Sequence, residues 1–155
     1  MKRTSTLLFL TLAIVVVCAC RPAEFVCPVT PPYGQNPPGE NPSELYLGND
    51  GLTTMLWPEG TIRFVEGGPG SVEADGSLAM KFPWWRGEGV RGPLTISERR
   101  LDREAKPLRA DIPEGYGETG FQASGLIFAS AGCWEVTARA GEAELSFVTR
   151  VSDER

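Results

Sequence analysis

The chain has 155 residues, a net charge of −5 at pH 7 and no histidine. The acidic balance, with no basic stripe, argues against a nucleic-acid partner, because such binding depends on neutralising phosphates. Without histidine the chain cannot build a Ser-His-Asp or Cys-His catalytic device, and its few cysteines predict no metal site. The GGPG segment (67–70) lacks the lysine and the following helix of a phosphate loop, so we expect no cofactor.

The first twenty residues have the pattern of an export signal that ends in a lipid-attachment sequence. A basic start precedes an apolar run over residues 7–17, which is too short for a membrane span of about 20 residues. The following VCAC (17–20) resembles a bacterial lipobox. We therefore expect residues 1–19 to be a lipoprotein signal peptide and Cys20 to carry the lipid anchor. Cys18 is the competing lipid site, and a plain secretory signal is the alternative interpretation.

Signal cleavage would leave 136 residues, enough for one domain with a workable core. It removes two basic residues and no acidic one, so the mature chain carries 13 basic and 20 acidic side chains, a net charge of −7. Such a chain gains nothing from anionic headgroups, and we expect the lipid alone to hold it at the membrane.

Cys27 and Cys133 are the cysteines that remain, and in an exported chain they most simply form one disulfide. They stand 106 residues apart, and the chain-entropy treatment gives such a cross-link roughly 4–5 kcal/mol as an upper value. Residues 20–43 are predicted to be a lipidated, proline-rich N-terminal segment. With the disulfide formed, its 28–43 part lies along the domain and only residues 21–26 form a free tether. Without the disulfide, the whole segment is expected to be a spacer that holds the domain off the membrane.

Residues 44–151 are predicted to form a single β domain, because short apolar runs between turn signals replace any helical period. Asn49-Asp50-Gly51 and Asp75-Gly76 predict hairpins. ERRLDREAK (98–106) is predicted to be either one helical turn or a charged loop. The predicted strands before the last hairpin cover residues 44–47, 52–57, 61–65, 71–74, 77–85, 94–97 and 120–128.

The most regular pattern lies at the end of the chain. Residues 133–140 alternate apolar and polar side chains, and after a turn at Gly141-Glu142 residues 145–151 do so again. This alternation predicts a half-buried antiparallel hairpin. About eight short strands at a spacing near ten residues predict an all-β, antiparallel two-sheet β-sandwich. We expect the charged and proline-bearing strands at the edges of the sheets.

The final hairpin also carries a resemblance. Residues 125–151 resemble the last two strands of small bacterial immunoglobulin-like sandwich domains, in which Gly-x-Trp opens the penultimate strand. Together with it, PWWRG (83–87), LRADIPEGYG (108–117) and GCWEVT (132–137) are similar to a group of uncharacterised bacterial envelope lipoproteins. The resemblance implies an immunoglobulin-like β-sandwich at the cell envelope and brings no activity with it.

Two tryptophans stand side by side in MKFPWWR (80–86), and strand alternation assigns them to opposite faces. Trp84 shares a face with Phe82 and Met80, and we expect it in the core near the Cys133 bridge. Trp85 shares the other face with Lys81.

Trp85, Arg86 and Lys81 are the candidate ligand-binding residues. An exposed tryptophan beside basic side chains is typical of an interaction hot spot and of a platform on which sugars stack. The alternative is that the 28–43 segment or a loop covers Trp85, which would then have a packing role.

No catalytic group stands out, and we expect no enzyme. A hydrolase with paired carboxylates is a third possibility, but its candidates lie in loops where nothing predicts a desolvated acid. Those candidates are Glu88, Asp102, Asp111, Glu114 and Glu118. The sequence therefore favours a non-catalytic binding module anchored in the envelope, with an envelope protein as partner or, as the alternative, a glycan or peptidoglycan.

Overall fold

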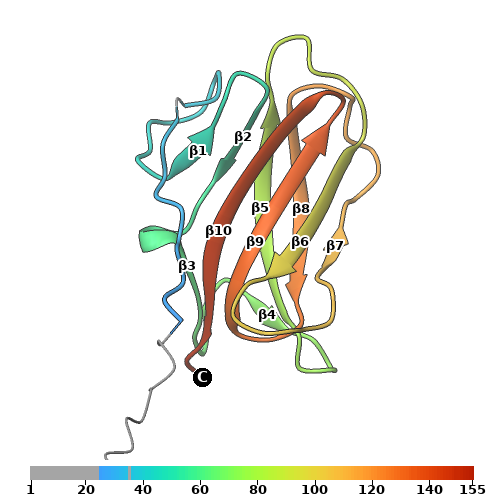
Figure 1. Ribbon diagram of the computed structural model, residues 1–155. Helices are drawn as coiled ribbons and strands as arrows, with labels where there is room; N and C mark the ends of the chain where they lie inside the picture. The colour runs from blue at the N-terminus through green and yellow to red at the C-terminus, as the bar shows by residue number, and fades with distance from the viewer. Residues whose placement is uncertain (1–24, 35) are drawn as a thin grey trace, which may run out of the picture.

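The computed structural model describes residues 25–34 and 36–155, so the predicted signal peptide and Cys20 lie outside the described residues. Within the described part, ten strands form two sheets that pack face to face as a β-sandwich (Figure 1). A short 3-10 turn, η1 (Pro58–Gly60), precedes the third strand. The prediction of an all-β, two-sheet sandwich is confirmed.

Sheet A has the order β1-β2-β5-β8-β7, with β4 also paired to β5. Its strands are β1 (Tyr46–Gly48), β2 (Leu52–Met55), β4 (Ser71–Val72), β5 (Leu78–Arg86), β7 (Arg109–Asp111) and β8 (Phe121–Phe128). Sheet B has the order β3-β10-β9-β6. Its strands are β3 (Thr61–Phe64), β6 (Leu94–Arg100), β9 (Gly132–Ala140) and β10 (Ala143–Asp153).

The predicted C-terminal hairpin is confirmed as β9 and β10, which pair antiparallel from Ala143↔Ala140 to Val151↔Gly132. Their apolar side chains point into the sandwich and are buried, as the alternation predicted. The buried set is Trp134, Val136, Ala138, Ala140, Leu145, Phe147 and Val151.

Both predicted turn signals also form hairpins. In the β1–β2 turn, Oδ1 of Asn49 accepts hydrogen bonds from the N–H groups of Gly51 and Leu52, at 2.8 and 2.9 Å. In the β4–β5 turn, the N–H of Ser77 donates to Oδ1 of Asp75 at 3.0 Å, and Gly76 takes a φ of 84°. Local turn chemistry therefore determines both connections.

The helical alternative for residues 98–106 is wrong. The loop alternative holds for residues 101–106 only, because residues 98–100 belong to strand β6. β6 continues to Arg100, because it pairs with β9 as far as Arg100↔Trp134. An ion pair of 2.8 Å between Arg99 and Glu135 joins the same two strands across their outer face. Cross-strand pairing outweighs the local helix signal here, and the chain leaves the sheet only after residue 100.

The expectation of an entirely antiparallel sandwich is corrected at β3, which pairs parallel with the end of β10 from Thr61↔Arg150 to Phe64↔Asp153. After η1 the chain crosses from sheet A to sheet B and runs beside β10 in the same direction (Figure 1). A tight hairpin would make two neighbouring strands antiparallel. β3 and β10 are far apart in sequence, so no such turn joins them and a parallel pairing is possible.

The expectation that proline marks an edge strand is wrong for β5, which holds Pro83 at the centre of sheet A. The pairing of β2 with β5 ends at Thr54↔Trp84, so no ladder partner of Pro83 stands on that side. The hydroxyl of Thr54 donates to the Pro83 carbonyl at 2.7 Å. The backbone polar groups of Pro83 therefore face the side of β5 on which β2 no longer pairs. The missing N–H therefore breaks no ladder hydrogen bond.

Trp84 is fully buried in the core, as predicted. Its indole N–H donates to the hydroxyl of Ser124 at 2.9 Å, which satisfies its polar atom. Its aromatic neighbours are Phe82 and Phe147, each with a ring centroid 6.3 Å away. The tryptophan next to Cys133 is a different one, Trp134 of β9.

The predicted disulfide joins Cys27 to Cys133 at the start of β9, with Cα atoms 5.6 Å apart. Beyond Cys27 the chain lies along sheet B, where the Thr30 N–H donates to the Val148 carbonyl at 2.9 Å and the Thr30 hydroxyl accepts from the Val148 N–H. Further on, the Gly48 N–H donates to the Tyr33 carbonyl at 2.9 Å. The proline-rich segment therefore bridges the two sheets at one side of the sandwich (Figure 1).

Candidate binding site

Trp85 lies on the outer face of sheet A, half-buried between two other aromatic rings. The ring of Tyr46 meets it edge-on at a centroid distance of 5.5 Å, and that of Phe121 is tilted at 5.4 Å. The indole N–H of Trp85 donates to Oε1 of Glu40 in the proline-rich segment at 3.2 Å. The 28–43 segment therefore covers Trp85 in part, as the alternative expected, and the rest of the side chain stays accessible.

Two exposed rings extend the aromatic surface beyond Trp85. Phe121, at the start of β8, is 45% exposed, and Tyr116 in the preceding loop is 40% exposed. Their ring centroids are 5.9 Å apart. We call Tyr46, Trp85, Phe121 and Tyr116 the aromatic ridge. Sequence reasoning missed Phe121 and Tyr116, because only the β5–β8 register shows that Phe121 stands beside Trp85.

The two outer faces of the sandwich differ in character. On sheet A, the central strands carry small or apolar side chains and one charge. Their outward residues are Ala79, Lys81, Pro83, Trp85, Phe121, Ala123, Gly125 and Ile127. The outer face of sheet B is polar, and it carries two ion pairs within the sheet, Arg99 with Glu135 at 2.8 Å and Arg139 with Glu144 at 2.7 Å. Arg150 of β10 is also exposed on this face.

Lys81 lies on the same outer face as Trp85 but not beside it. Lys81 and Trp85 are four positions apart on β5, which is about 13 Å along an extended strand. Lys81 is exposed and stands opposite Gly125 of β8, whose other neighbour in the ladder is Asp111 of β7. Lys81 can therefore contribute a positive charge to this face only at a distance from the aromatic ridge.

Arg86 does not join this surface, and its expected place beside Trp85 is corrected. Alternation along β5 points it inward with Trp84, and only 8% of Arg86 is exposed. Its guanidinium donates to the Gly117 carbonyl at 3.0 Å and to Oε1 of Gln122. Burial lowers the pKa of Arg86, and the nearby Glu118 raises it to a smaller extent.

The guanidinium of Arg86 lines a pocket of about 350 Å³ at one end of the sandwich. Two of the sequence motifs meet there, PWWRG through Arg86 and LRADIPEGYG through its last six residues. The opposite wall is the start of β6 with Gly92 and Pro93. Tyr116 lines this pocket and also packs on Phe121, so the pocket adjoins the aromatic ridge.

The five carboxylates considered for hydrolysis are distributed over the molecule. Only Glu114 and Glu118 line a common pocket, that of Arg86, and both are exposed. Glu88 lines a separate hollow beside the β1–β2 turn, and Asp111 belongs to β7. Asp102 binds the Arg100 guanidinium at 2.7 and 3.0 Å.

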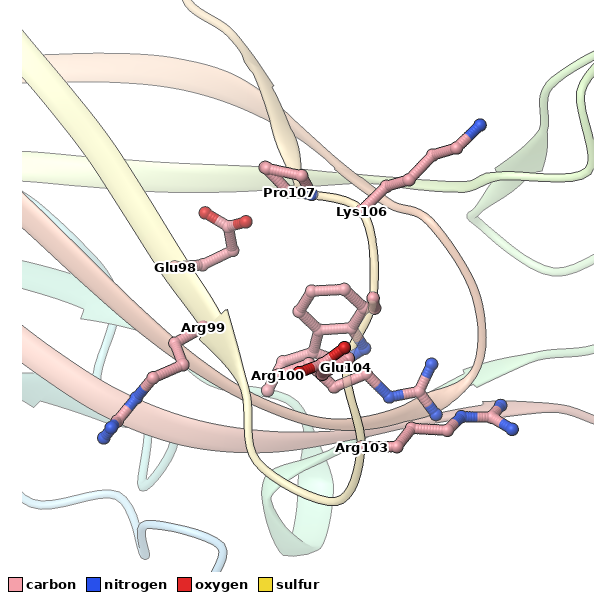
Figure 2. Close-up of a pocket in the computed structure, with 9 residues that line it drawn as sticks. Glu98, Arg99, Arg100, Arg103, Glu104, Lys106 and Pro107 are labelled. Atoms are coloured by element: carbon pink, nitrogen blue, oxygen red, sulfur yellow. The ribbon is translucent and has the colours of Figure 1, made fainter.

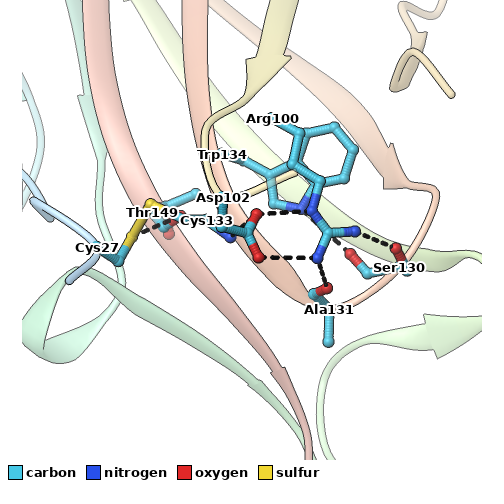
Figure 3. A network of polar contacts seen from close by, with 8 residues as sticks. All are labelled: Cys27, Arg100, Asp102, Ser130, Ala131, Cys133, Trp134 and Thr149. Atoms are coloured by element: carbon cyan, nitrogen blue, oxygen red, sulfur yellow. Dashed lines mark hydrogen bonds and ion pairs between the residues drawn. A yellow bond between two sulfur atoms is a disulfide. The ribbon is translucent and has the colours of Figure 1, made fainter. Parts of the chain in front are cut away.

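A polar network that the sequence did not indicate surrounds Arg100, next to the disulfide (Figure 3). Besides binding Asp102, the guanidinium donates to the hydroxyl of Ser130 and the carbonyl of Ala131, both at 2.6 Å, and lies 5.6 Å from the Trp134 ring centroid. Oδ1 of Asp102 also accepts from the Cys133 N–H at 3.2 Å. These contacts tie the loop after β6 to the β8–β9 turn.

The same loop forms one wall of a second hollow, of about 490 Å³ (Figure 2). Side chains of both signs surround it, including Arg103, Glu104 and Lys106. A carboxylate oxygen of Glu98 accepts from the Leu108 N–H, and burial raises the pKa of Glu98. Glu98 thus holds the loop against β6. The charges around the hollow favour neither an anionic nor a cationic ligand.

Within residues 25–34 and 36–155, no group of three or more His, Cys, Asp or Glu side chains is placed to hold a metal ion. Among the described residues, no helix has the length and apolar character needed to span a bilayer. Comparisons of the chain with protein-family models, curated proteins and solved structures found no match. The candidate site therefore rests on its own geometry, and the resemblance to envelope lipoproteins stays a prediction.

Proposed function

We propose that the protein is a non-catalytic binding module, held at the cell envelope by a lipid on Cys20, and that it binds another envelope protein through the aromatic ridge. The observation that carries this proposal is the difference between the two outer faces. Sheet B presents a polar face with two ion pairs between its own strands, whereas sheet A presents the ridge, in which Phe121 and Tyr116 are each at least 40% exposed.

Aromatic residues at the centre of a patch with few charges are typical of protein–protein interfaces, where they supply most of the binding free energy. The ridge has this composition: Phe121 and Tyr116 are exposed, Trp85 is half-buried, and the buried ring of Tyr46 supports Trp85 from one side. The rings also support one another, because each contacts the next at centroid distances of 5.4–5.9 Å. A partner therefore meets a surface that is largely formed in advance, which lowers the entropic cost of binding.

The location at the envelope has a separate support. The Cys27–Cys133 disulfide indicates an oxidising compartment, outside the cell or in its envelope. Attachment through Cys20 rests on the lipobox pattern alone, and mass spectrometry of the N-terminal peptide tests it. Acyl chains on Cys20 are the expected result, and an unmodified mature N-terminus would contradict the anchor.

The interface is tested by quantitative capture from membrane extracts of the producing cell. The tagged full chain is compared with Phe121→Glu, which places a charge on the ridge, and with Thr95→Glu, a matched change at an exposed position of sheet B. We expect one partner protein to be depleted at least about tenfold by Phe121→Glu and unaffected by Thr95→Glu. Equal recovery of every captured protein with both variants would contradict the proposal.

A glycan is the second candidate partner, because exposed aromatic rings also suit sugar stacking. Cosedimentation of the full chain with purified cell wall tests this candidate. Trp85→Ala is expected to abolish sedimentation if the glycan lies on the ridge, with Val148→Ala on sheet B as the control. Sedimentation that Trp85→Ala leaves unchanged would exclude the glycan interpretation.

We also infer that the sandwich is immunoglobulin-like. If β2, β5, β6, β7, β8, β9 and β10 are lettered A to G, the sheets have the orders A-B-E-D and G-F-C, which is the strand order of an immunoglobulin constant-type domain. The disulfide departs from that pattern, because it joins the N-terminal segment to the sixth lettered strand rather than two strands of opposite sheets.

A further inference from the structure

Arg86 is a buried cation with which no carboxylate of the described residues is in ion-pair contact, although Glu114 and Glu118 line the same pocket. The guanidinium has five N–H donors, and its hydrogen-bond partners are two neutral groups, the Gly117 carbonyl and the Gln122 side chain. Its Nε has no hydrogen-bond partner among the described residues. No carboxylate of residues 25–34 or 36–155 forms an ion pair with it.

A buried charge of this kind is costly, by several kcal/mol, unless an opposite charge or a full set of hydrogen bonds compensates it. Arg100 shows how the same fold treats a structural arginine: Asp102 binds it at 2.7 and 3.0 Å, and two further acceptors complete its contacts. Arg86 has no such partner. The contrast between the two arginines points to a ligand group for Arg86.

The surroundings of Arg86 hold the guanidinium in a fixed orientation. It is the last residue of β5, its backbone N–H donates to the Gly120 carbonyl at 3.0 Å, and its side chain is held by Gly117 and Gln122. The loop that returns over the sheet end needs glycine, since Gly115 and Gly120 have φ values of 91° and 73°. The pocket of about 350 Å³ that this loop encloses with Arg86 is large enough for a small organic ligand.

The rim of the pocket limits the charge of that ligand. Glu114 and Glu118 line it, and their carboxylates repel a dianion such as phosphate more strongly than a carboxylate. They also offer an attractive site for a positive group carried by the same ligand. The arrangement of one buried guanidinium and two exposed carboxylates is therefore complementary to a zwitterion.

We propose that the Arg86 pocket binds the carboxylate of a small zwitterionic, amino-acid-like ligand, with the guanidinium of Arg86 on the carboxylate and Glu118 or Glu114 near the ammonium group. This site does not depend on which partner the aromatic ridge binds. Tyr116 belongs to both surfaces, because it lines the pocket and its ring packs on Phe121.

The test is a titration of the ¹⁵N-labelled exported protein, followed through the Nε–H resonance of Arg86 in NMR spectra at constant ionic strength. The probes are acetate, glycine, ethylammonium and inorganic phosphate. We expect saturable shifts with acetate and glycine, a lower Kd for glycine than for acetate, weaker binding of phosphate and none of ethylammonium. The absence of a saturable shift with both acetate and glycine would overturn the proposal.

Three variants separate the roles of the guanidinium and of the two carboxylates on the rim. Arg86→Lys keeps the charge but loses the planar donor fork, and we expect it to weaken glycine binding at least about tenfold, followed through the Gly117 amide. Glu118→Gln changes an exposed side chain and leaves the fold intact. It is expected to reduce the preference for glycine over acetate, whereas an unchanged preference in that variant and in Glu114→Gln would overturn the role of the acidic rim.

Discussion

At the scale of single residues, the three neighbours Trp84, Trp85 and Arg86 have three different roles. Alternation along β5 places Trp84 in the core, Trp85 on the outer face and Arg86 inward again, at the end of the sandwich. The sequence predicted the separation of the two tryptophans. The same alternation points Arg86 inward, so placing Arg86 with Trp85 because the two are adjacent was wrong. The partners of Arg86, Gly117 and Gln122, are distant in the chain and could not be predicted.

The different roles of the two tryptophans predict different effects on stability. Trp84→Ala leaves a cavity between Phe82 and Phe147 and an unpaired Ser124 hydroxyl, so we expect it to lower the free energy of unfolding by about 3–5 kcal/mol. Trp85→Ala removes a half-buried side chain, and we expect a loss of about 1 kcal/mol. Urea denaturation measures both, and losses of equal size would contradict the assignment of faces.

The ion pair of Arg100 and Asp102 predicts a pH dependence. Hydrogen bonds from the Arg100 guanidinium lower the pKa of Asp102 from its ordinary value of 3.8 to about 2. Since the pKa is lower in the folded state, the ionised carboxylate contributes stability that is complete above about pH 4 and is lost as the pH falls toward 2.

We therefore expect the stability difference between the native chain and Asp102→Asn to be constant above about pH 4 and to shrink between about pH 4 and pH 2. Urea unfolding of both proteins at a series of pH values measures it. Glu59→Gln, at an exposed ion pair with Arg63, is the matched control and is expected to change stability little at any pH. A difference that stays constant through this range would show that Asp102 is not held by Arg100.

At the scale of elements, local signals predicted well where local chemistry decides the structure. The β9–β10 hairpin and the turns at Asn49 and Asp75 follow from alternation and turn residues within a few positions. The errors arose where distant strands decide. Whether Pro83 faces a ladder partner on β2 depends on where β2 stops pairing with β5. The direction of β3 depends on its pairing with β10, about ninety residues later in the chain.

The disulfide is predicted to fix an element that has few other attachments. Between Cys27 and β1, the backbone of the N-terminal segment is tied to the strands at Val148 and Gly48. We expect the Cys27→Ser, Cys133→Ser double variant to lose up to about 4–5 kcal/mol of unfolding free energy and to show faster amide exchange at Thr30. Urea denaturation and hydrogen exchange check the two effects, and native-like protection of Thr30 in the variant would contradict the stapling role.

At the scale of the whole molecule, the outer face of sheet B is polar and carries ion pairs, whereas the outer face of sheet A carries the aromatic ridge. The general fold could be predicted from strand spacing, but the candidate site could not. Phe121, Tyr116 and Gln122 belong to the loop and strand beyond β7, and only the β5–β8 pairing brings them to Trp85 and Arg86. The surface is thus a product of topology, and no short motif contains it.

The most direct test of the proposed binding face is site-specific photo-crosslinking in intact cells that produce the full chain. A photoreactive residue replaces Phe121 on the ridge or Ser146 on the outer face of sheet B, both of which are exposed. We expect a discrete protein adduct from position 121 that Trp85→Ala removes, and no such adduct from position 146. An adduct from position 146 with none from position 121 would contradict the proposed binding face.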